Sequence, residues 1–261
     1  MQIVAIISSY RKKGNTAHIV QQIEAHMRAL AACQNTSLEF EVLYLSDMNL
    51  RSCRGCRTCF DRGEDKCPLK DDVPAIKAKM DAADGVIFAT PVYVDDVSGL
   101  MKTLLDRLAY LCHRPGFGGK CAFPLATVGG SPASHTLRTL NGALLTWGFH
   151  LVGQAGFKMG ALMPQTEVES RFQSETAKVA EKLFRAVAQQ QALHPSFVSL
   201  LAFKVQQLAW QRESPDSFDY AYWKQQGWLE PTCTFYFPPR GSRVKVALAR
   251  LAGAIAARVL T

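Results

Sequence analysis

"QIVAIISSYRKKGNTAHIV", residues 2–20, joins an apolar run to a helical pattern through a polar turn. Its first six residues form a short, mostly apolar run, which is typical of a parallel strand that is buried on both faces. After the turn, Ile19, Ile23 and Met27 recur at helical spacing. A strand, a glycine-containing turn and a helix in this order predict the opening unit of an open α/β sheet.

The same alternation of strand and helix patterns continues to about residue 155. Further strands are predicted at 40–45, 85–90, 123–128 and 149–154. Helices are predicted at 16–32, 73–80, 98–112, 134–147 and 169–193. We therefore predict a doubly wound, five-stranded parallel sheet with helices on both faces.

The composition is that of an ordinary globular protein. Of its 261 residues, 48% are hydrophobic and 20% are charged, which excludes wholesale disorder. No apolar run reaches the roughly 18 residues of a membrane span, and the start lacks a basic leader. The eight cysteines are therefore expected as thiols or metal ligands in a reducing cytoplasm. Four of them are dispersed and expected to be buried free thiols: Cys33, Cys112, Cys121 and Cys233.

The chain divides into two predicted parts. Residues 1–193 form the main domain, which contains a cysteine loop at 53–67, and residues 194–261 form a helical C-terminal extension. The formal net charge is +8, and the last 22 residues hold five basic and no acidic residues: Arg240, Arg243, Lys245, Arg250 and Arg258. Because the main domain is only mildly basic, no nucleic-acid partner is expected.

The segment 243–260 carries an apolar stripe at helical spacing. The stripe consists of Val244, Leu248, Leu251, Ile255 and Val259. With basic residues on its other sides, such a helix could bind an anionic membrane surface. The favoured interpretation is packing on the domain or on a partner subunit, because stripes of this kind usually belong to a core.

The polar turn at 8–16 lies where open α/β sheets bind their ligands. It contains no acidic residue, and a helix amino end adds amide donors and a positive dipole. The residues that suit a terminal phosphate are Ser8, Ser9, Arg11, Gly14, Asn15 and Thr16. The turn matches neither a Walker loop nor G-x-G-x-x-G. The alternative is an ordinary turn in which Thr16 caps the helix.

Three segments resemble one known family. "SSYRKKGNT" (8–16) is similar to the S-x-R-x-x-G-N-T phosphate loop of the flavodoxin-like NAD(P)H-dependent FMN reductases. "TPVYVDDVSGLMKTLLDR" (90–107) and "VGGSPASHTLRTL" (128–140) resemble that family's second and third flavin loops. The resemblance implies a flavodoxin-like fold, FMN as cofactor and a homo-oligomer.

The resemblance also implies which other residues contact the flavin. Pro91, Val92 and Tyr93 would flank its flat ring system, and the pyrimidine edge would meet a second set: Gly129, Gly130, Ser131 and His135. Two alternatives stay open, since Tyr93 could simply pack in its loop and His135 could be a surface residue at a helix start.

Four cysteines are spaced C-x2-C-x2-C-x7-C: Cys53, Cys56, Cys59 and Cys67. Closely spaced loop thiolates can converge on one cluster, whereas structural zinc sites more often use two distant C-x2-C pairs. The pattern resembles that of the iron–sulfur flavoproteins, a branch of the same family with a [4Fe–4S] cluster near the flavin. A cluster-free loop followed by an acidic pair, here Asp71 and Asp72, also occurs in this superfamily and stays an alternative.

The predicted function is that of an FMN-dependent NAD(P)H oxidoreductase. Electrons would pass from the reduced nicotinamide through FMN to a quinone, a flavin or another small acceptor. A second hypothesis is an iron–sulfur flavoprotein that takes electrons from a ferredoxin through a [4Fe–4S] cluster to FMN. A third is a peripheral membrane quinone reductase that uses the basic C-terminal helix. No residue is assigned as a general acid.

Overall fold

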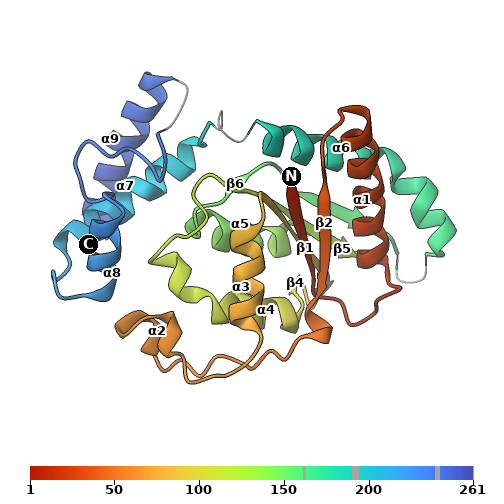
Figure 1. Cartoon of the computed structure of the whole chain (residues 1–261), viewed down its shortest axis with the longest axis horizontal. Coiled ribbons are helices and arrows are strands. Elements are labelled where there is room, and N and C mark those ends of the chain that lie inside the picture. Colours follow the sequence, from red (N-terminus) through yellow and green to blue (C-terminus); the bar gives the residue numbers. More distant parts are fainter. Residues whose placement is uncertain (161–162, 190–193, 239–241, 261) are drawn as a thin grey trace.

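The structure, a computed structural model, describes residues 1–160, 163–189, 194–238 and 242–260 (Figure 1). Its strands are β1 (Gln2–Ile7), β2 (Glu39–Tyr44), β3 (Gly85–Tyr93), β4 (Asp96–Val97), β5 (Cys121–Val128), β6 (His150–Leu151) and β7 (Ala155–Lys158). Its helices are α1 (Asn15–Cys33), α2 (Thr58–Asp61), α3 (Val73–Ala82), α4 (Gly99–Arg107), α5 (Ser134–Thr146), α6 (Gln165–Ala188), α7 (Phe197–Arg212), α8 (Phe218–Gln225) and α9 (Arg243–Leu260). Short 3-10 turns lie at Leu45–Asp47, Glu64–Lys66 and Ala109–Cys112.

The sheet is parallel in the order β2, β1, β3, β5, followed by a fifth position that β6 and β7 share beside β5. This is the flavodoxin-like strand order, and the predicted doubly wound parallel sheet is confirmed. The predicted strand at 149–154 is interrupted. Gly153 lies in the gap, where an added Cβ would come within 3.1 Å of the Phe123 ring. A glycine weakens a strand because it has no side chain to pack.

Helices cover both faces of the sheet (Figure 1). On one face α1 and α6 pack together over a core that includes Ile19, Ile23 and Met27, as their spacing predicts. On the other face α3, α4 and α5 enclose a second core. There the rings of Phe117 and Phe149 stack with their centroids 4.2 Å apart.

Two predicted helices differ from the observed ones by several residues at an end. The helix predicted at 98–112 ends at Arg107 and continues as a 3-10 turn over Ala109–Cys112. The helix predicted at 169–193 already begins at Gln165, and residues 190–193 of that prediction lie outside the described residues. Sequence patterns specify the ends of helices least well, because helix ends fray and the last turn often becomes a 3-10 turn.

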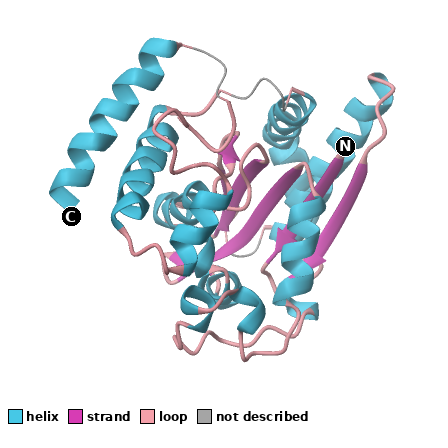
Figure 2. Cartoon of the chain, turned by 60° about the vertical axis from the view of Figure 1, so that its left-hand side comes forward, coloured by secondary structure: helices cyan, strands magenta, loops and turns pink. Residues whose placement is uncertain are grey.

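The C-terminal helices build an apolar cluster of their own. Its buried members are Leu200, Phe203, Trp223, Trp228, Phe235 and Ala249. Helix α9 runs along the outer edge of the molecule (Figure 2). The apolar stripe of α9 is exposed, so it does not pack on the domain, whereas the alternative of packing on a partner subunit stays a prediction. Val259, the fifth predicted member, lies outside the described side chains, and Arg240 lies outside the described residues.

Two further features bear on the sequence predictions. In the described part of the chain, no helix is both long enough and apolar enough to cross a membrane. All eight cysteines are free thiols. Of the four dispersed cysteines only Cys121 is buried, and the expectation fails most clearly for Cys33, which is exposed on α1 because it ends the helix away from its apolar face.

Candidate functional site: three loops and a cysteine cavity

Three loops meet at one edge of the sheet. Because β1, β3 and β5 are parallel, their carboxyl ends lie together, and the register pairs Ile7 with Ala89 and Pro91 with Thr127. The loops that follow these strands are therefore neighbours. They contain the three segments that the sequence singles out as ligand-binding.

The first loop ends at an open helix amino terminus. Gly14 occupies the cap position of α1, and no described side chain caps this end. The first turn of α1 has no acidic residue, while Arg11 and Lys13 beside it are exposed. Lys12 is engaged elsewhere, with its Nζ 2.8 Å from Asp47. Unsatisfied amide groups, a positive dipole end and nearby cations together suit an anionic group such as a phosphate.

Thr16 does not cap the helix, so the capping alternative is wrong. It lies one residue inside α1 and is buried, with its Oγ1 2.7 Å from the Oγ1 of Thr127 at the end of β5. This hydroxyl pair joins the first loop to the third. Thr127 is a residue that sequence reasoning missed, because a threonine at a strand end carries no signal of its own.

Ser8 and Ser9 are buried and take part in hydrogen bonds within the site. The Ser98 hydroxyl donates to Ser8 Oγ at 2.8 Å and to the Ser8 carbonyl at 3.1 Å. Ser98 also caps α4, and Ser9 Oγ accepts from the Arg11 amide at 3.2 Å. Sequence reasoning missed Ser98, although a serine directly before a helical pattern is a recognisable capping signal.

The second loop is a tight hairpin between β3 and β4. Its two central residues, Val94 and Asp95, have φ of 49° and 65°. Positive φ at both positions is typical of a type I′ turn, which normally selects Asn or Gly. Val94 is fully exposed and Tyr93 is 47% exposed, whereas Pro91 is buried. The hairpin thus presents an aromatic ring at the sheet edge on a strained turn.

The third loop has small or absent side chains, and the start of the helix after it is hydrogen-bonded to the second loop. Gly129, Gly130 and Ser131 are exposed, and a Cβ added at Gly130 would meet nothing within 4 Å. His135, at the start of α5, donates from Nδ1 to the Asp95 carbonyl at 3.0 Å. Thr136 donates to the same carbonyl at 3.3 Å. His135 is therefore a surface residue that also positions the hairpin.

The cysteine loop is anchored at both ends by an acidic pair. Asp72 accepts from the Asn49 amide at 2.7 Å, and Asp71 accepts from the Arg51 amide at 2.9 Å. The Asp71 carboxylate also forms a buried ion pair with Arg107 of α4. Burial raises the pKa of Asp71, but the hydrogen bonds from Arg107 and Arg51 outweigh it and hold this pKa below its ordinary value.

The four thiols of this loop sit in different surroundings. Cys53 and Cys56 are exposed, and a hydrogen bond with Thr58, at 3.3 Å, lowers the pKa of the Cys56 thiol. Cys59 is half-buried, and burial raises the pKa of its thiol. Cys67 is half-buried with its Sγ 3.7 Å from Arg107 Nη2.

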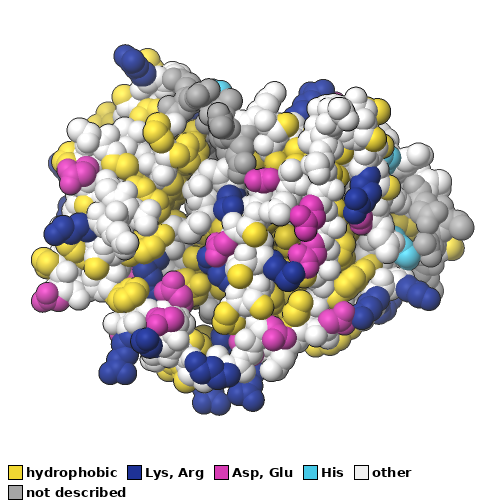
Figure 3. Space-filling model, viewed as in Figure 1, with side chains coloured by type: hydrophobic (Ala, Val, Ile, Leu, Met, Phe, Trp, Pro, Cys, Tyr) yellow, Lys and Arg dark blue, Asp and Glu magenta, His cyan; other side chains and the backbone are white. Residues whose placement is uncertain are grey.

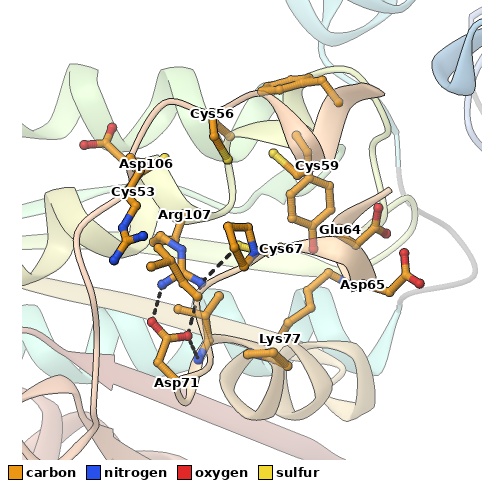
Figure 4. Close-up of a pocket in the computed structure, with 18 of the residues that line it drawn as sticks. Cys53, Cys56, Cys59, Glu64, Asp65, Cys67, Asp71, Lys77, Asp106 and Arg107 are labelled. Carbon is orange, nitrogen blue, oxygen red and sulfur yellow. Dashed lines mark hydrogen bonds and ion pairs between the residues drawn. The ribbon is translucent and has the colours of Figure 1, made fainter. Parts of the chain in front are cut away.

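All four cysteines line one cavity of about 570 Å³ (Figure 4). Arg107, Lys77 and the ring of Tyr110 also line it. Within the described ranges, no three His, Cys, Asp or Glu side chains stand close enough to hold a metal ion. The predicted ligand set is thus gathered around one cavity but does not form a metal centre in this structure.

A buried arginine ties the cysteine loop to the C-terminal helices. Arg114 forms an ion pair with Asp219 of α8, donates to the Cys59 carbonyl and lies 3.1 Å from Glu64. The ring of Phe218 covers its guanidinium at 4.8 Å. No signal in the sequence pointed to Arg114 or Asp219, because 105 residues separate them along the chain.

The comparisons with known proteins agree with this geometry. A model of the family described as NADPH-dependent FMN reductase matches residues 1–161. The chain belongs to this family. The family match covers all three sheet-edge loops and the cysteine loop, which makes the protein an FMN-dependent oxidoreductase.

Two curated relatives and one solved structure extend the comparison. An iron–sulfur flavoprotein of Archaeoglobus fulgidus is 29% identical over 88% of this chain and 100% of its own length. An iron–sulfur flavoprotein of Methanosarcina thermophila is 29% identical over 70% of this chain and 93% of its own. The structure of RosB, with a bound 8-demethyl-8-formylriboflavin-5'-phosphate, aligns with 93% of this chain and 92% of its own at a TM-score of 0.58 and 14% identity. The last similarity establishes the flavodoxin-like fold alone.

Proposed function

We propose that this FMN reductase family member oxidises NAD(P)H and reduces a quinone, a flavin or another small acceptor. The observation that carries the proposal is the meeting of the three family-like loops at one sheet edge, beside the uncapped amino end of α1. When FMN is bound there, it supplies the hydride and electron chemistry. The chain's own residues bind it, orient it and leave one side open to substrates.

The first loop would hold the phosphate. Backbone amides at Asn15 and Thr16 lie at the positive end of the α1 dipole, and the exposed Arg11 adds a positive charge. Gly14 is buried against Arg11, and an added Cβ there would come within 3.0 Å of the Arg11 carbonyl, so a larger residue would disturb the turn. Ser8 and Ser9 would shape this loop through their hydrogen bonds with Ser98 and Arg11.

The other two loops would hold the ring system. Tyr93, exposed on the hairpin, would flank one face of the flat ring together with Pro91 and Val92. Gly129, Gly130 and Ser131 offer backbone amides without bulky side chains, and those amides would meet the polar edge. His135 would act through the hairpin that it fastens at Asp95.

Removing the Arg11 guanidinium tests the phosphate loop. Arg11→Ala should weaken FMN binding roughly 10-fold or more, because a hydrogen bond to a charged group contributes about 1.5–3 kcal/mol. The matched control is Arg28→Ala, which removes an equal charge from the second half of α1, away from the first loop, and should leave FMN affinity unchanged. Fluorescence quenching of FMN measures both, and equal affinities for the two variants would contradict the assignment.

A second candidate function is that of an iron–sulfur flavoprotein which receives electrons from a ferredoxin. The supporting observation is that Cys53, Cys56, Cys59 and Cys67 line one cavity beside the cationic Arg107. The compact spacing of the four thiols suits a [4Fe–4S] cluster, which would supply one-electron transfer when bound, better than it suits a structural zinc site, which more often uses two distant C-x2-C pairs. The curated relatives bear the name iron–sulfur flavoprotein.

Iron and acid-labile sulfide assays on anaerobically purified protein test the second candidate. We expect four irons and four sulfides per chain if the loop holds a [4Fe–4S] cluster. Cys67→Ser should then lose most of the iron, while Cys233→Ser in the C-terminal extension should keep it. If the protein contains no iron and still oxidises NAD(P)H fully, the iron–sulfur candidate is contradicted and the NAD(P)H oxidoreductase remains.

The division of the chain, its assembly and its location also stay predictions. We propose a main domain at residues 1–193, an extension at 194–261, a homo-oligomeric assembly and a location in a reducing cytoplasm. The separate apolar cluster of the extension supports the division of the chain. Light scattering on the FMN-loaded protein tests the assembly, and a mass equal to one chain at all concentrations would contradict it.

A further inference from the structure

Helix α9 packs through its small residues. Ala249, Gly253 and Ala257 follow one another at intervals of four and are the buried residues among the side chains of α9 that the structure describes. At Gly253 the contact with α7 is close, because an added Cβ would lie 2.8 Å from Lys204 Cβ and 2.9 Å from the Leu201 carbonyl. This close fit fixes which face of α9 points away from α7, and the helix itself lies at the outer edge of the molecule (Figure 2).

The outward face of α9 carries four large aliphatic side chains, whereas Val246 packs against the apolar cluster of the extension. Their exposed fractions are 68% for Val244, 54% for Leu248, 61% for Leu251 and 58% for Ile255. Hydrophobic side chains lie at the surface over this part of the chain (Figure 3). The usual arrangement of an amphipathic helix is thus reversed, and a contiguous apolar row of this kind marks a surface that contacts something else.

The rim of this row is basic. Arg243 and Arg258 are exposed beside it on one side, and Lys245 is half-buried on the other. Arg250 faces the body instead and donates to the carbonyls of Cys233 and Pro231, each at 2.9 Å. After Glu230 the chain contains no acidic residue. An apolar row with a purely cationic rim is complementary to an apolar layer that carries negative charge.

A second copy of α9 is a poorer match for the same surface. In a parallel pair, each basic side chain would face its own equivalent. In an antiparallel pair centred on Leu251, Arg243 of one helix would lie near Arg258 of the other. Both arrangements place like charges together with no carboxylate of the helix to offset them, which is destabilising.

We propose that the outward face of α9 binds the surface of an anionic lipid bilayer. Val244, Leu248, Leu251 and Ile255 enter the boundary between headgroups and acyl chains, while Arg243, Lys245 and Arg258 contact the anionic headgroups. The helix lies in the plane of the surface, because the packing of Ala249, Gly253 and Ala257 on α7 keeps its other face on the protein.

Flotation of the full-length, FMN-loaded protein with lipid vesicles tests the proposal. One set contains phosphatidylcholine alone, and the other contains equal amounts of phosphatidylcholine and phosphatidylglycerol. We expect flotation with the second set only. The double variant Leu251→Gln/Ile255→Gln should reduce the bound fraction about 10-fold or more, since two buried aliphatic side chains are lost. NAD(P)H oxidation in solution should not change.

The control separates this surface from the overall positive charge. Lys178→Gln/Lys182→Gln removes two exposed cations from α6, and Arg243→Gln/Arg258→Gln removes two from α9. Only the α9 pair should weaken flotation. Equal losses from both pairs, or equal flotation of the wild type and the Leu251/Ile255 variant, would overturn the proposal. Absent flotation together with a dimer that the Leu251/Ile255 variant dissociates would assign the face to a second copy instead.

Discussion

At the scale of single residues, Asp71 and Arg107 form a buried ion pair at the base of the cysteine loop. Asp71→Asn removes the carboxylate and leaves Arg107 buried without its counter-charge. We expect this variant to lose about 3–5 kcal/mol in the free energy of unfolding, as for other broken buried pairs. Urea denaturation measures the loss. The control is Asp106→Asn, whose exposed pair with Lys102 contributes at most about 0.5 kcal/mol.

The same pair makes a prediction about pH. Because the pKa of Asp71 is held below its ordinary value in the folded protein, its carboxylate stabilises the fold above the unfolded pKa of about 3.9. This stabilisation is lost as the pH falls through the lower, folded pKa. The difference in unfolding free energy between wild type and Asp71→Asn should therefore be constant near neutral pH and shrink in acid. A difference that grows in acid would contradict the assigned direction.

Val94 stands in a conformation that β-branched residues rarely adopt. Val94→Asn should raise the free energy of unfolding by about 1 kcal/mol, since Asn tolerates positive φ and the fully exposed valine loses no packing. Thermal unfolding of the FMN-free protein measures this gain. A loss of stability instead would mean that the hairpin turn is not strained.

At the scale of elements, the contact between α7 and α9 depends on Gly253. Gly253→Ala should destabilise the protein by about 1–3 kcal/mol, because the added methyl group clashes with Lys204 and the Leu201 backbone. The matched control is Gly142→Ala in α5, where the site is open. There the same substitution should stabilise by about 0.5–1 kcal/mol through helix propensity. Stabilisation at both sites would contradict the packing of α9.

Helix α8 holds the cysteine loop through Asp219 and Arg114. Asp219→Asn should loosen that loop, so that hydrogen exchange of its backbone amides becomes faster. The exposed Asp216→Asn, a neighbour in the chain, should have no such effect. Mass spectrometry of peptides from residues 53–67 resolves the two. Unchanged exchange in Asp219→Asn would show that the loop is held by its own contacts.

Local sequence patterns predict the secondary-structure elements better than the contacts between them. The sheet, the helices around it and the three loops follow from local periodicity and motif order, and were predictable. The gap in the fifth strand depends on the approach of Gly153 to Phe123, which local patterns do not reveal. The Ser8–Ser98 contact and the Arg114–Asp219 pair join residues far apart in sequence, and only Ser98 carried a local signal. Packing of the α9 stripe on the domain was a wrong expectation, because the close contact of α9 with α7 uses small residues and leaves Leu248, Leu251 and Ile255 exposed.

At the scale of the whole molecule, the proposed chemistry concerns two places, the carboxyl edge of the sheet and the cysteine cavity. The three loops at the ends of β1, β3 and β5 form the proposed flavin site. The cysteine cavity lies between its loop and the helices α3 and α4. The C-terminal extension holds the cysteine loop with α8 and presents the apolar row of α9 on the outside.

The most direct test of the central proposal is anaerobic mixing of the FMN-loaded protein with NADH or NADPH while the visible absorbance of the flavin is followed. We predict that at least one nicotinamide bleaches the flavin rapidly without any ferredoxin, and that a quinone then restores the absorbance. Protein that does not bind FMN, or bound FMN that stays oxidised with both nucleotides, would contradict an NAD(P)H oxidoreductase.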